Sequence, residues 1–184
     1  LRFVNQFVKH PQFLEGYVQN AQKYMATHEF DYFLFSYNGL PERQITKGDI
    51  TGKVCRFGEC CGSLNAMNQH CYRAQCFETT RLLVKALNIP EGKYITSFQS
   101  RLGKNPWVKP YTDDVIKELP GKGIKSVLAF SPAFVADCLE TTIEVGEEYR
   151  EIFEEAGGKH WQLVESLNDS PIWIETLVDL VKTA

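Results

Sequence analysis

Five of the six cysteines fall in one short segment of the chain, and their thiols have the most specific chemistry in this sequence. They are Cys55, Cys60, Cys61, Cys71 and Cys76. Thiolates bind soft metals and iron–sulfur clusters, so a metal or cluster site is one interpretation, beside disulfides and inert thiols. Disulfide frameworks spread their cysteines along small chains, whereas these are local and include an adjacent pair. Two Cys-x4-Cys spacings without a Cys-x2-Cys pair favour an iron–sulfur cluster over zinc.

The size and charge of the chain argue against several classes of protein. Its 184 residues suit a single domain over 1–184, which is large enough to bury a core without disulfides. The net charge of -3 argues against a nucleic-acid-binding protein that relies on a basic face. No apolar run approaches the roughly 20 residues that span a bilayer, so we expect no transmembrane segment. The chain begins with Leu1 and not with Met, and we expect it to begin inside a longer protein.

Apolar runs of strand length alternate with segments of helical periodicity. We predict strands at residues 32–36, 94–98, 126–130 and 161–164. We predict helices at residues 3–28, 72–87, 112–119, 137–155 and 171–181. Continuously apolar strands between helices are typical of an α/β fold, with a parallel sheet of about four strands and helices on both faces. Residues 50–76 then form a cysteine-rich insertion after a long loop, and residues 171–184 contain a C-terminal helix.

Three loops are the best candidates for a binding site. Ligands of such sheets bind beyond the carboxyl ends of the strands. This rule selects the loops at residues 37–41, 99–107 and 131–138. Of all segments of the chain, these three have the composition that is hardest to explain by packing.

The sequences of these loops resemble those of protoporphyrin ferrochelatase. The matching motifs are Phe35-Ser36-Tyr37-Asn38-Gly39-Leu40-Pro41, Ser97-Phe98-Gln99-Ser100-Arg101-Leu102-Gly103, Pro106-Trp107, Pro110-Tyr111-Thr112-Asp113, Asp137-Cys138-Leu139-Glu140-Thr141 and Ser166-Leu167-Asn168. The resemblance covers nearly the whole chain. It implies a lyase of haem biosynthesis that inserts ferrous iron into protoporphyrin IX, in the cytoplasm. It also implies a flavodoxin-like fold and, because the family has two similar halves, a missing amino-terminal half as partner.

One position departs from the family pattern. The family motif at the first strand end contains a histidine where this chain has Asn38. An imidazole titrates near neutral pH and serves as a base or metal ligand. An amide accepts no proton and ligates only weakly through its oxygen. Asn38 is therefore a candidate catalytic and iron-contacting position at which we expect impaired activity.

Three glutamates are candidates for handling protons and iron. Glu140 matches the active-site glutamate of the family, and the resemblance makes it the main catalytic candidate. Glu144 and Glu148 follow at i+4 and i+8, so the three carboxylates would share one face of a helix. The alternative is a solvated acidic helix, because further glutamates surround this row.

The resemblance also implies a porphyrin pocket. Its candidate residues are Tyr37, Gln99, Arg101, Trp107 and Phe134. Arg101 would bind a porphyrin propionate as a bidentate donor, or form a surface ion pair with Asp113 or Asp114. A loop anchor at Trp107 and core packing at Phe134 are the alternative interpretations of the two aromatic residues.

The resemblance gives the cysteines a role beside the catalytic site. Some bacterial members of the family hold a 2Fe–2S cluster in an internal segment that ends in Cys-Tyr-Arg-Ala-Gln-Cys, the sequence of residues 71–76. We expect Cys55, Cys61, Cys71 and Cys76 to bind it, with Cys60 as an alternative to Cys61. A non-catalytic porphyrin-binding or iron–sulfur sensor module on the same fold is the second functional hypothesis.

Overall fold

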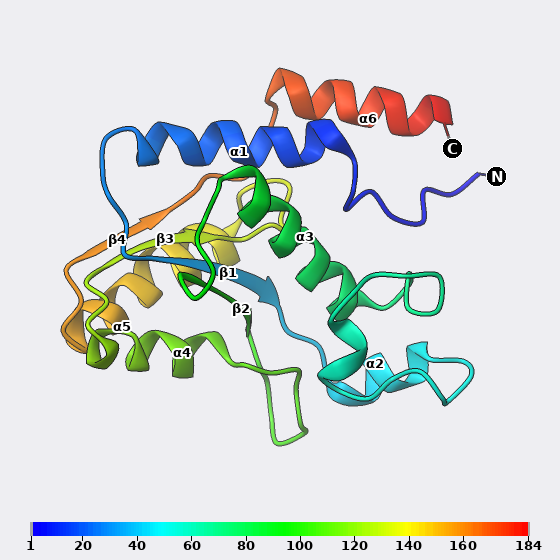
Figure 1. The fold of residues 1–184 in the computed structure, drawn as a ribbon, viewed down its shortest axis with the longest axis horizontal. Coiled ribbons are helices and arrows are strands. Elements are labelled where there is room, and N and C mark those ends of the chain that lie inside the picture. Colours follow the sequence, from blue (N-terminus) through cyan, green and yellow to red (C-terminus); the bar gives the residue numbers. More distant parts are fainter. Residues whose placement is uncertain (1, 184) are drawn as a thin grey trace.

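Four parallel strands form one sheet at the centre of the molecule (Figure 1). The structure is a computed structural model that describes residues 2–183. The strands are β1 (Tyr32–Asn38), β2 (Tyr94–Gln99), β3 (Ser126–Phe130) and β4 (His160–Leu163), in the order β2-β1-β3-β4. The predicted α/β fold with a four-stranded parallel sheet is confirmed.

One face of the sheet packs against α1 (Pro11–Met25) and α3 (Tyr72–Ala86). Successive side chains of a strand point to opposite faces, so Phe33 and Phe35 both point to this side. The last helix, α6 (Pro171–Thr183), packs on α1 as a further layer. This face contains the larger of the two apolar cores.

The opposite face packs against α4 (Thr112–Glu118) and α5 (Tyr149–Glu155). Leu34 and Val127 are fully buried there against residues of these helices. A nine-residue π-helix, η3 (Glu140–Glu148), leads directly into α5. Helices therefore cover both faces, as the continuously apolar strands predict.

The first helix begins later than its periodicity predicts. The expected helix starts near residue 3, whereas α1 starts at Pro11. Proline disfavours the helical conformation for the residue before it and suits the first helical position. His10 accordingly adopts an extended conformation. Before it, Phe7 packs against the core without forming a helix, whereas Phe3 and Val4 are exposed.

Two other segments differ from the sequence-based prediction. The expected α-helix at 137–155 is a π-helix in its first part, in which hydrogen bonds join residues five apart. The predicted loop before the cysteines contains a short helix, α2 (Glu42–Gly48). Single 3-10 turns occur at η1 (Glu59–Cys61) and η2 (Pro120–Lys122).

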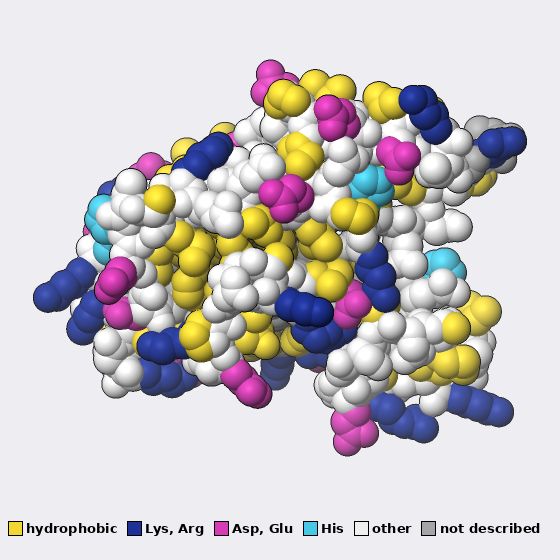
Figure 2. All heavy atoms as spheres, turned by 45° about the horizontal axis from the view of Figure 1, so that its top comes forward, with side chains coloured by type: hydrophobic (Ala, Val, Ile, Leu, Met, Phe, Trp, Pro, Cys, Tyr) yellow, Lys and Arg dark blue, Asp and Glu magenta, His cyan; other side chains and the backbone are white. Residues whose placement is uncertain are grey.

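The cysteine-rich segment lies beyond the carboxyl end of β1, between α2 and α3 (Figure 1). Within residues 2–183, no helix is both long and apolar enough to cross a membrane. On the face shown in Figure 2, acidic and basic side chains are mixed. Parallel strands thus place their carboxyl ends, the cysteine segment and the start of η3 on one side of the sheet.

Candidate active site

The carboxyl ends of β1 and β2 meet at Asn38 and Gln99, which are partners in the sheet register. The Gly39 N–H donates to the Gln99 carbonyl oxygen over 2.8 Å. A Cβ at position 39 would lie 2.6 Å from that oxygen and 3.2 Å from the Trp107 ring, so the close approach requires glycine. A β-bridge between Pro41 and Trp107 brings the tryptophan loop to the same place. We call this place, defined by these five residues, the strand edge.

Asn38 presents an amide to the strand edge. Its side-chain Nδ2 donates to the Gly39 carbonyl over 3.0 Å. Its backbone carbonyl accepts a hydrogen bond from the Tyr72 hydroxyl over 2.8 Å. The tyrosine belongs to α3, at the end of the cysteine segment. The backbone at Asn38 is therefore held from the cysteine side as well as from β2.

Glu144 extends from η3 to the end of β2. Its Oε2 accepts hydrogen bonds from Ser100 Oγ at 2.8 Å and from Gln99 Nε2 at 3.2 Å. Its Oε1 accepts the Tyr149 hydroxyl at 2.9 Å. Burial, followed by the charge of Glu144, raises the pKa of Tyr149 above its usual range. Three donors, from β2, the residue after it and α5, thus hold this half-buried carboxylate in one orientation.

Ser100 reaches Glu144 through an unusual backbone conformation. Its φ is +61°, in the left-handed region that residues other than glycine seldom adopt. Such conformations persist where the surrounding structure holds them, and they concentrate at functional sites. The conformation directs the Ser100 hydroxyl to the carboxylate directly after β2 ends.

Glu140 and Glu148 lie in a different environment from Glu144. Both side chains are exposed to solvent, whereas Glu144 is half-buried. A hydrogen bond with the Cys138 thiol, followed by one with the backbone N–H of Glu140, lowers the pKa of Glu140. The row of three glutamates therefore contains one carboxylate fixed to the sheet and two that face water.

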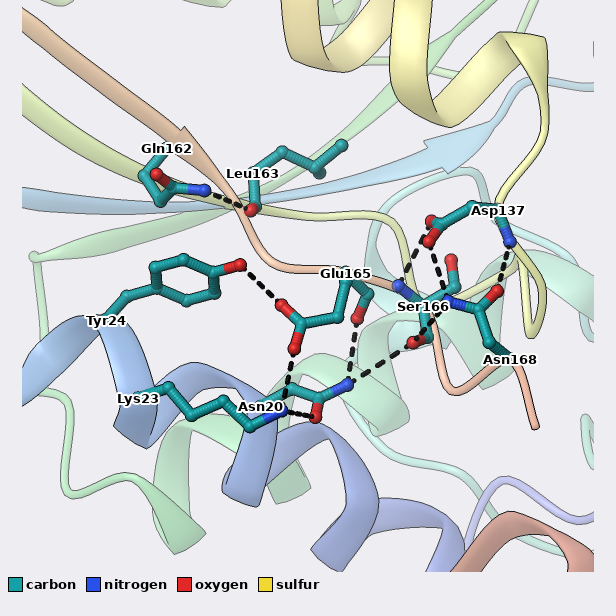
Figure 3. A network of polar contacts seen from close by, with 9 residues as sticks. All are labelled: Asn20, Lys23, Tyr24, Asp137, Gln162, Leu163, Glu165, Ser166 and Asn168. Carbon is teal, nitrogen blue, oxygen red and sulfur yellow. Dashed lines mark hydrogen bonds and ion pairs between the residues drawn. The ribbon is translucent and has the colours of Figure 1, made fainter. Parts of the chain in front are cut away.

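A polar network fixes the loop that leads into η3 (Figure 3). Asp137 accepts hydrogen bonds from the Ser166 N–H at 3.1 Å and from Asn168 Nδ2 at 2.8 Å, and its own N–H donates to Asn168 Oδ1 at 2.8 Å. Partial burial opposes ionisation, but these hydrogen bonds hold the pKa of Asp137 below its usual value. Asn20 of α1 donates to the Ser166 carbonyl at 3.3 Å. The network thus connects α1, the segment after β4 and the start of the π-helix.

Four of the five clustered cysteines form a chain of neighbouring thiols. The Cys60 and Cys61 sulfurs lie 3.9 Å apart, and the Cys61 thiol is hydrogen-bonded to Cys71. This hydrogen bond, with backbone N–H groups that oppose the effect of burial, lowers the pKa of Cys71 to about 6. Cys55 interacts with Cys60. None of the six cysteines forms a disulfide.

A cavity of about 420 Å³ lies beside these thiols. Cys55, Cys60 and Cys71 contribute to its wall, together with Met67 and His70. In the described residues 2–183, no three or more His, Cys, Asp and Glu side chains are grouped closely enough to hold one metal ion.

The fifth cysteine, Cys76, lies on the buried face of α3. Its thiol is 3% exposed and interacts with Tyr72, and burial raises its pKa.

The whole chain, residues 1–184, matches the family model described as Ferrochelatase. The chain belongs to the ferrochelatase family. It is 42% identical over 186 residues to "Ferrochelatase" of Pseudomonas fluorescens (strain Pf0-1), covering 100% of this chain and 54% of that protein. It is 38% identical over 179 residues to "Ferrochelatase" of Coxiella burnetii (strain Dugway 5J108-111), covering 97% and 51%. The predicted family is confirmed, and the chain spans about half the length of the curated relatives that it matches.

The residues that the ferrochelatase motifs suggest for porphyrin binding differ in their exposure and in their contacts. Trp107 is half-buried at the strand edge, and its Nε1 donates to the Leu102 carbonyl at 2.9 Å. Arg101 is exposed, stacks over Tyr111 at 4.3 Å and forms an ion pair with Asp113 at 3.0 Å.

Two of the other three porphyrin candidates are buried, and the third is half-buried. Gln99 is 1% exposed, and Tyr37 is 2% exposed with its hydroxyl 3.0 Å from Thr80 in the α3 core. Phe134 is half-buried, and its carbonyl accepts the Tyr17 hydroxyl at 2.8 Å. Arg101 is therefore the most exposed of the five porphyrin candidates, Trp107 and Phe134 are half-buried, and Gln99 and Tyr37 are buried.

Sequence reasoning missed several residues that shape the site. Tyr72 was noted only as part of the cysteine motif, although it holds the Asn38 carbonyl. The motifs at 137–141 and 166–168 were recognised separately, but nothing in the sequence shows that Asp137 bonds to Asn168. Tyr149 gave no signal, because its partner Glu144 lies five residues away across a π-helical turn.

Proposed function

We propose that this chain forms part of a ferrochelatase that inserts ferrous iron into protoporphyrin IX to give protohaem. The observation that best supports this is the Glu144 carboxylate, which Gln99 and Ser100 hold at the carboxyl end of β2, next to the end of β1. Family membership and the location of ligand sites in open parallel sheets support the same conclusion. The length of the relatives supports a second half of the same enzyme as partner.

The reaction requires groups that accept protons and groups that guide iron. Two pyrrole nitrogens each lose a proton and keep the electron pair, and these pairs bind Fe²⁺ to give a neutral metal site in the porphyrin. The exposed carboxylates of Glu140 and Glu148 would accept protons or pass iron towards Glu144. Such a role agrees with their exposure to solvent on either side of the fixed carboxylate.

The flat, apolar porphyrin requires aromatic contacts and few cations. Trp107 and Phe134 would contact the macrocycle, with Tyr37 and Gln99 in the layer beneath it. Arg101 would bind a propionate by exchanging its exposed partner Asp113, because a guanidinium binds carboxylates in bidentate fashion.

The asparagine at position 38 leads us to expect a low rate of iron insertion. It takes the place of the family histidine at the strand edge, and an amide accepts no proton. The four histidines lie elsewhere: His10 interacts with Asp179, His28 stacks on His160, and His70 lines the cavity beside the cysteines. We therefore expect iron insertion to be slow, and replacing Asn38 with histidine to increase the rate.

We further propose a 2Fe–2S cluster in the cysteine segment, which would supply one-electron chemistry or a structural cross-link when bound. The ligand set expected from the sequence is Cys55, Cys61, Cys71 and Cys76, with Cys60 as the alternative to Cys61. The donor set fits a cluster, because Cys55, Cys60 and Cys71 line one cavity and the Cys61 thiol is hydrogen-bonded to Cys71. The position of Cys60 beside Cys61, and the burial of Cys76 against Tyr72, support Cys60 over Cys76. Six unpaired cysteines also agree with a reducing compartment, and we propose the cytoplasm.

Iron insertion by the full-length protein that contains this chain is the test of the enzyme. Anaerobic incubation with Fe²⁺ and protoporphyrin IX, followed by haem absorbance, measures the rate. We expect Asn38→His to raise the rate by about 10²-fold or more, the contribution typical of a general base. Glu144→Gln should lower the rate, whereas the exposed Glu147→Gln on the same π-helix should not. A reverted protein that binds porphyrin without metallating it would instead indicate a binding module.

Iron and acid-labile sulfide analysis, with a visible absorption spectrum, is the test of the cluster. Cys71→Ser should abolish the cluster, and comparison of Cys60→Ser with Cys76→Ser identifies the remaining ligand. A colourless protein with one zinc per chain would contradict the proposal.

A further inference from the structure

A buried chain of polar side chains runs beneath the strand edge. Ser36, Ser97 and Thr112 are 0% exposed, and Gln99 is 1% exposed. They come from β1, β2 and the first turn of α4. Polar groups at this depth destabilise the fold unless each finds a hydrogen-bond partner, so their pairing requires an explanation.

The pairing converges on the Gln99 amide. Ser36 Oγ donates to Gln99 Oε1 at 2.7 Å and lies 3.0 Å from Thr112 Oγ1. Thr112 Oγ1 is in turn 2.9 Å from Ser97 Oγ. The oxygen end of the amide therefore faces Ser36. The opposite end, Nε2, then points to Glu144 Oε2 at 3.2 Å.

We propose that Gln99 is a positioning residue for Glu144. Ser36 holds the oxygen end of the amide, and the Nε2 end holds the carboxylate at the strand edge from inside the sheet. Ser100 and Tyr149 supply the other two hydrogen bonds to this carboxylate. Gln99 is thereby assigned to the layer beneath the site and makes no contact with porphyrin. The catalytic part of this proposal rests on the proposed ferrochelatase function.

The physical basis is the low polarity of the surroundings. A hydrogen bond is electrostatically stronger away from water, and a chain of them reinforces its members. Ser36 donates its one hydroxyl proton to Gln99 Oε1, and Thr112 donates its own to Ser97, so the amide oxygen is satisfied without a buried charge. Supporting residues of this kind change metal affinity or activity about 10- to 100-fold when they are removed.

The test compares Gln99→Leu with a matched control on the same strand. Thr96→Val also breaks a buried side-chain hydrogen bond, that of Thr96 Oγ1 with Thr80 Oγ1 at 2.9 Å, but on the face that packs against α3. The first measurement is the ¹³C resonance of the Glu144 side-chain carboxyl in the 184-residue chain. We expect the chemical shift of this resonance to change in Gln99→Leu and to remain unchanged in Thr96→Val. An unchanged Glu144 resonance in Gln99→Leu would overturn the positioning role, whatever the activity.

The second measurement is iron insertion by the full-length protein in the Asn38→His background. We expect Gln99→Leu to lower kcat about 10- to 100-fold with little change in KM for porphyrin, because the lost group positions the carboxylate and binds no substrate. Equal kcat in Gln99→Leu and Thr96→Val would show that Gln99 serves only the fold, and would overturn the proposal. Absence of iron insertion in every variant would overturn the ferrochelatase function itself, while the carboxyl resonance still decides the positioning role.

Discussion

Gly39 is the residue whose substitution tests the strand edge most directly. In Gly39→Ala, the new Cβ would lie 2.6 Å from the Gln99 carbonyl oxygen, about 0.8 Å short of the 3.4 Å at which ordinary contact begins. The same oxygen accepts the Gly39 N–H at 2.8 Å. Relief of the clash by moving the two strands apart would lengthen this hydrogen bond beyond its normal range, up to about 3.2 Å. The Trp107 ring, 3.2 Å from the new atom, blocks movement on the other side.

The expected destabilisation follows from these two effects. Overpacking costs about 1–3 kcal/mol, and a lost backbone hydrogen bond about 1 kcal/mol. We therefore expect Gly39→Ala to lower the free energy of unfolding by about 2–4 kcal/mol, measured by urea denaturation of the 184-residue chain.

Gly48→Ala is the matched control. A Cβ at position 48 would meet no atom within 4 Å, and Gly48 is the last residue of α2. Alanine there should be neutral or stabilise by up to about 1 kcal/mol. If Gly39→Ala is as stable as Gly48→Ala, the strand edge is not tightly packed and our reasoning about its geometry is wrong.

Three further predictions concern the surroundings of the site. Tyr72→Phe should lower the free energy of unfolding by about 1 kcal/mol in urea denaturation, because it removes the hydrogen bond to the Asn38 carbonyl; unchanged stability would contradict that bond. The pKa of Asp137 is lowered in the folded state, so its stabilising effect is present above the unfolded value near 3.9 and disappears as pH falls through the folded value. Wild type should accordingly be more stable than Asp137→Asn at pH 7 and lose that advantage near pH 2, and a pH-independent difference would refute the linkage. Cys71→Ser should remove iron and sulfide from the purified protein while Cys138→Ser retains them, and equal iron content in both would exclude Cys71 as a ligand.

The sheet was predictable because its signal is local. Strands such as Ser126–Phe130 are short apolar runs bounded by polar residues, and burial on both faces leaves no other arrangement for them. The boundary of α1 was predicted wrongly, because helical spacing alone does not detect the restriction that Pro11 imposes on His10. The π-helix at Glu140–Glu148 was also missed, since the glutamate spacing fits an ordinary helix equally well.

The candidate site divides in the same way. The residue types at Asn38, Trp107 and Glu140 could be read from motifs, and the loops that contain them follow from the rule for parallel sheets. The sequence by itself determined the fold class, the family and the presence of a thiol-rich segment, because these depend on residue type and spacing along the chain. Only the tertiary structure decided that Gln99 faces the interior, that Glu144 is the fixed carboxylate and that Tyr72 holds Asn38. Those contacts join residues 34 to 45 positions apart, and their distances depend on how helices and strands pack in three dimensions.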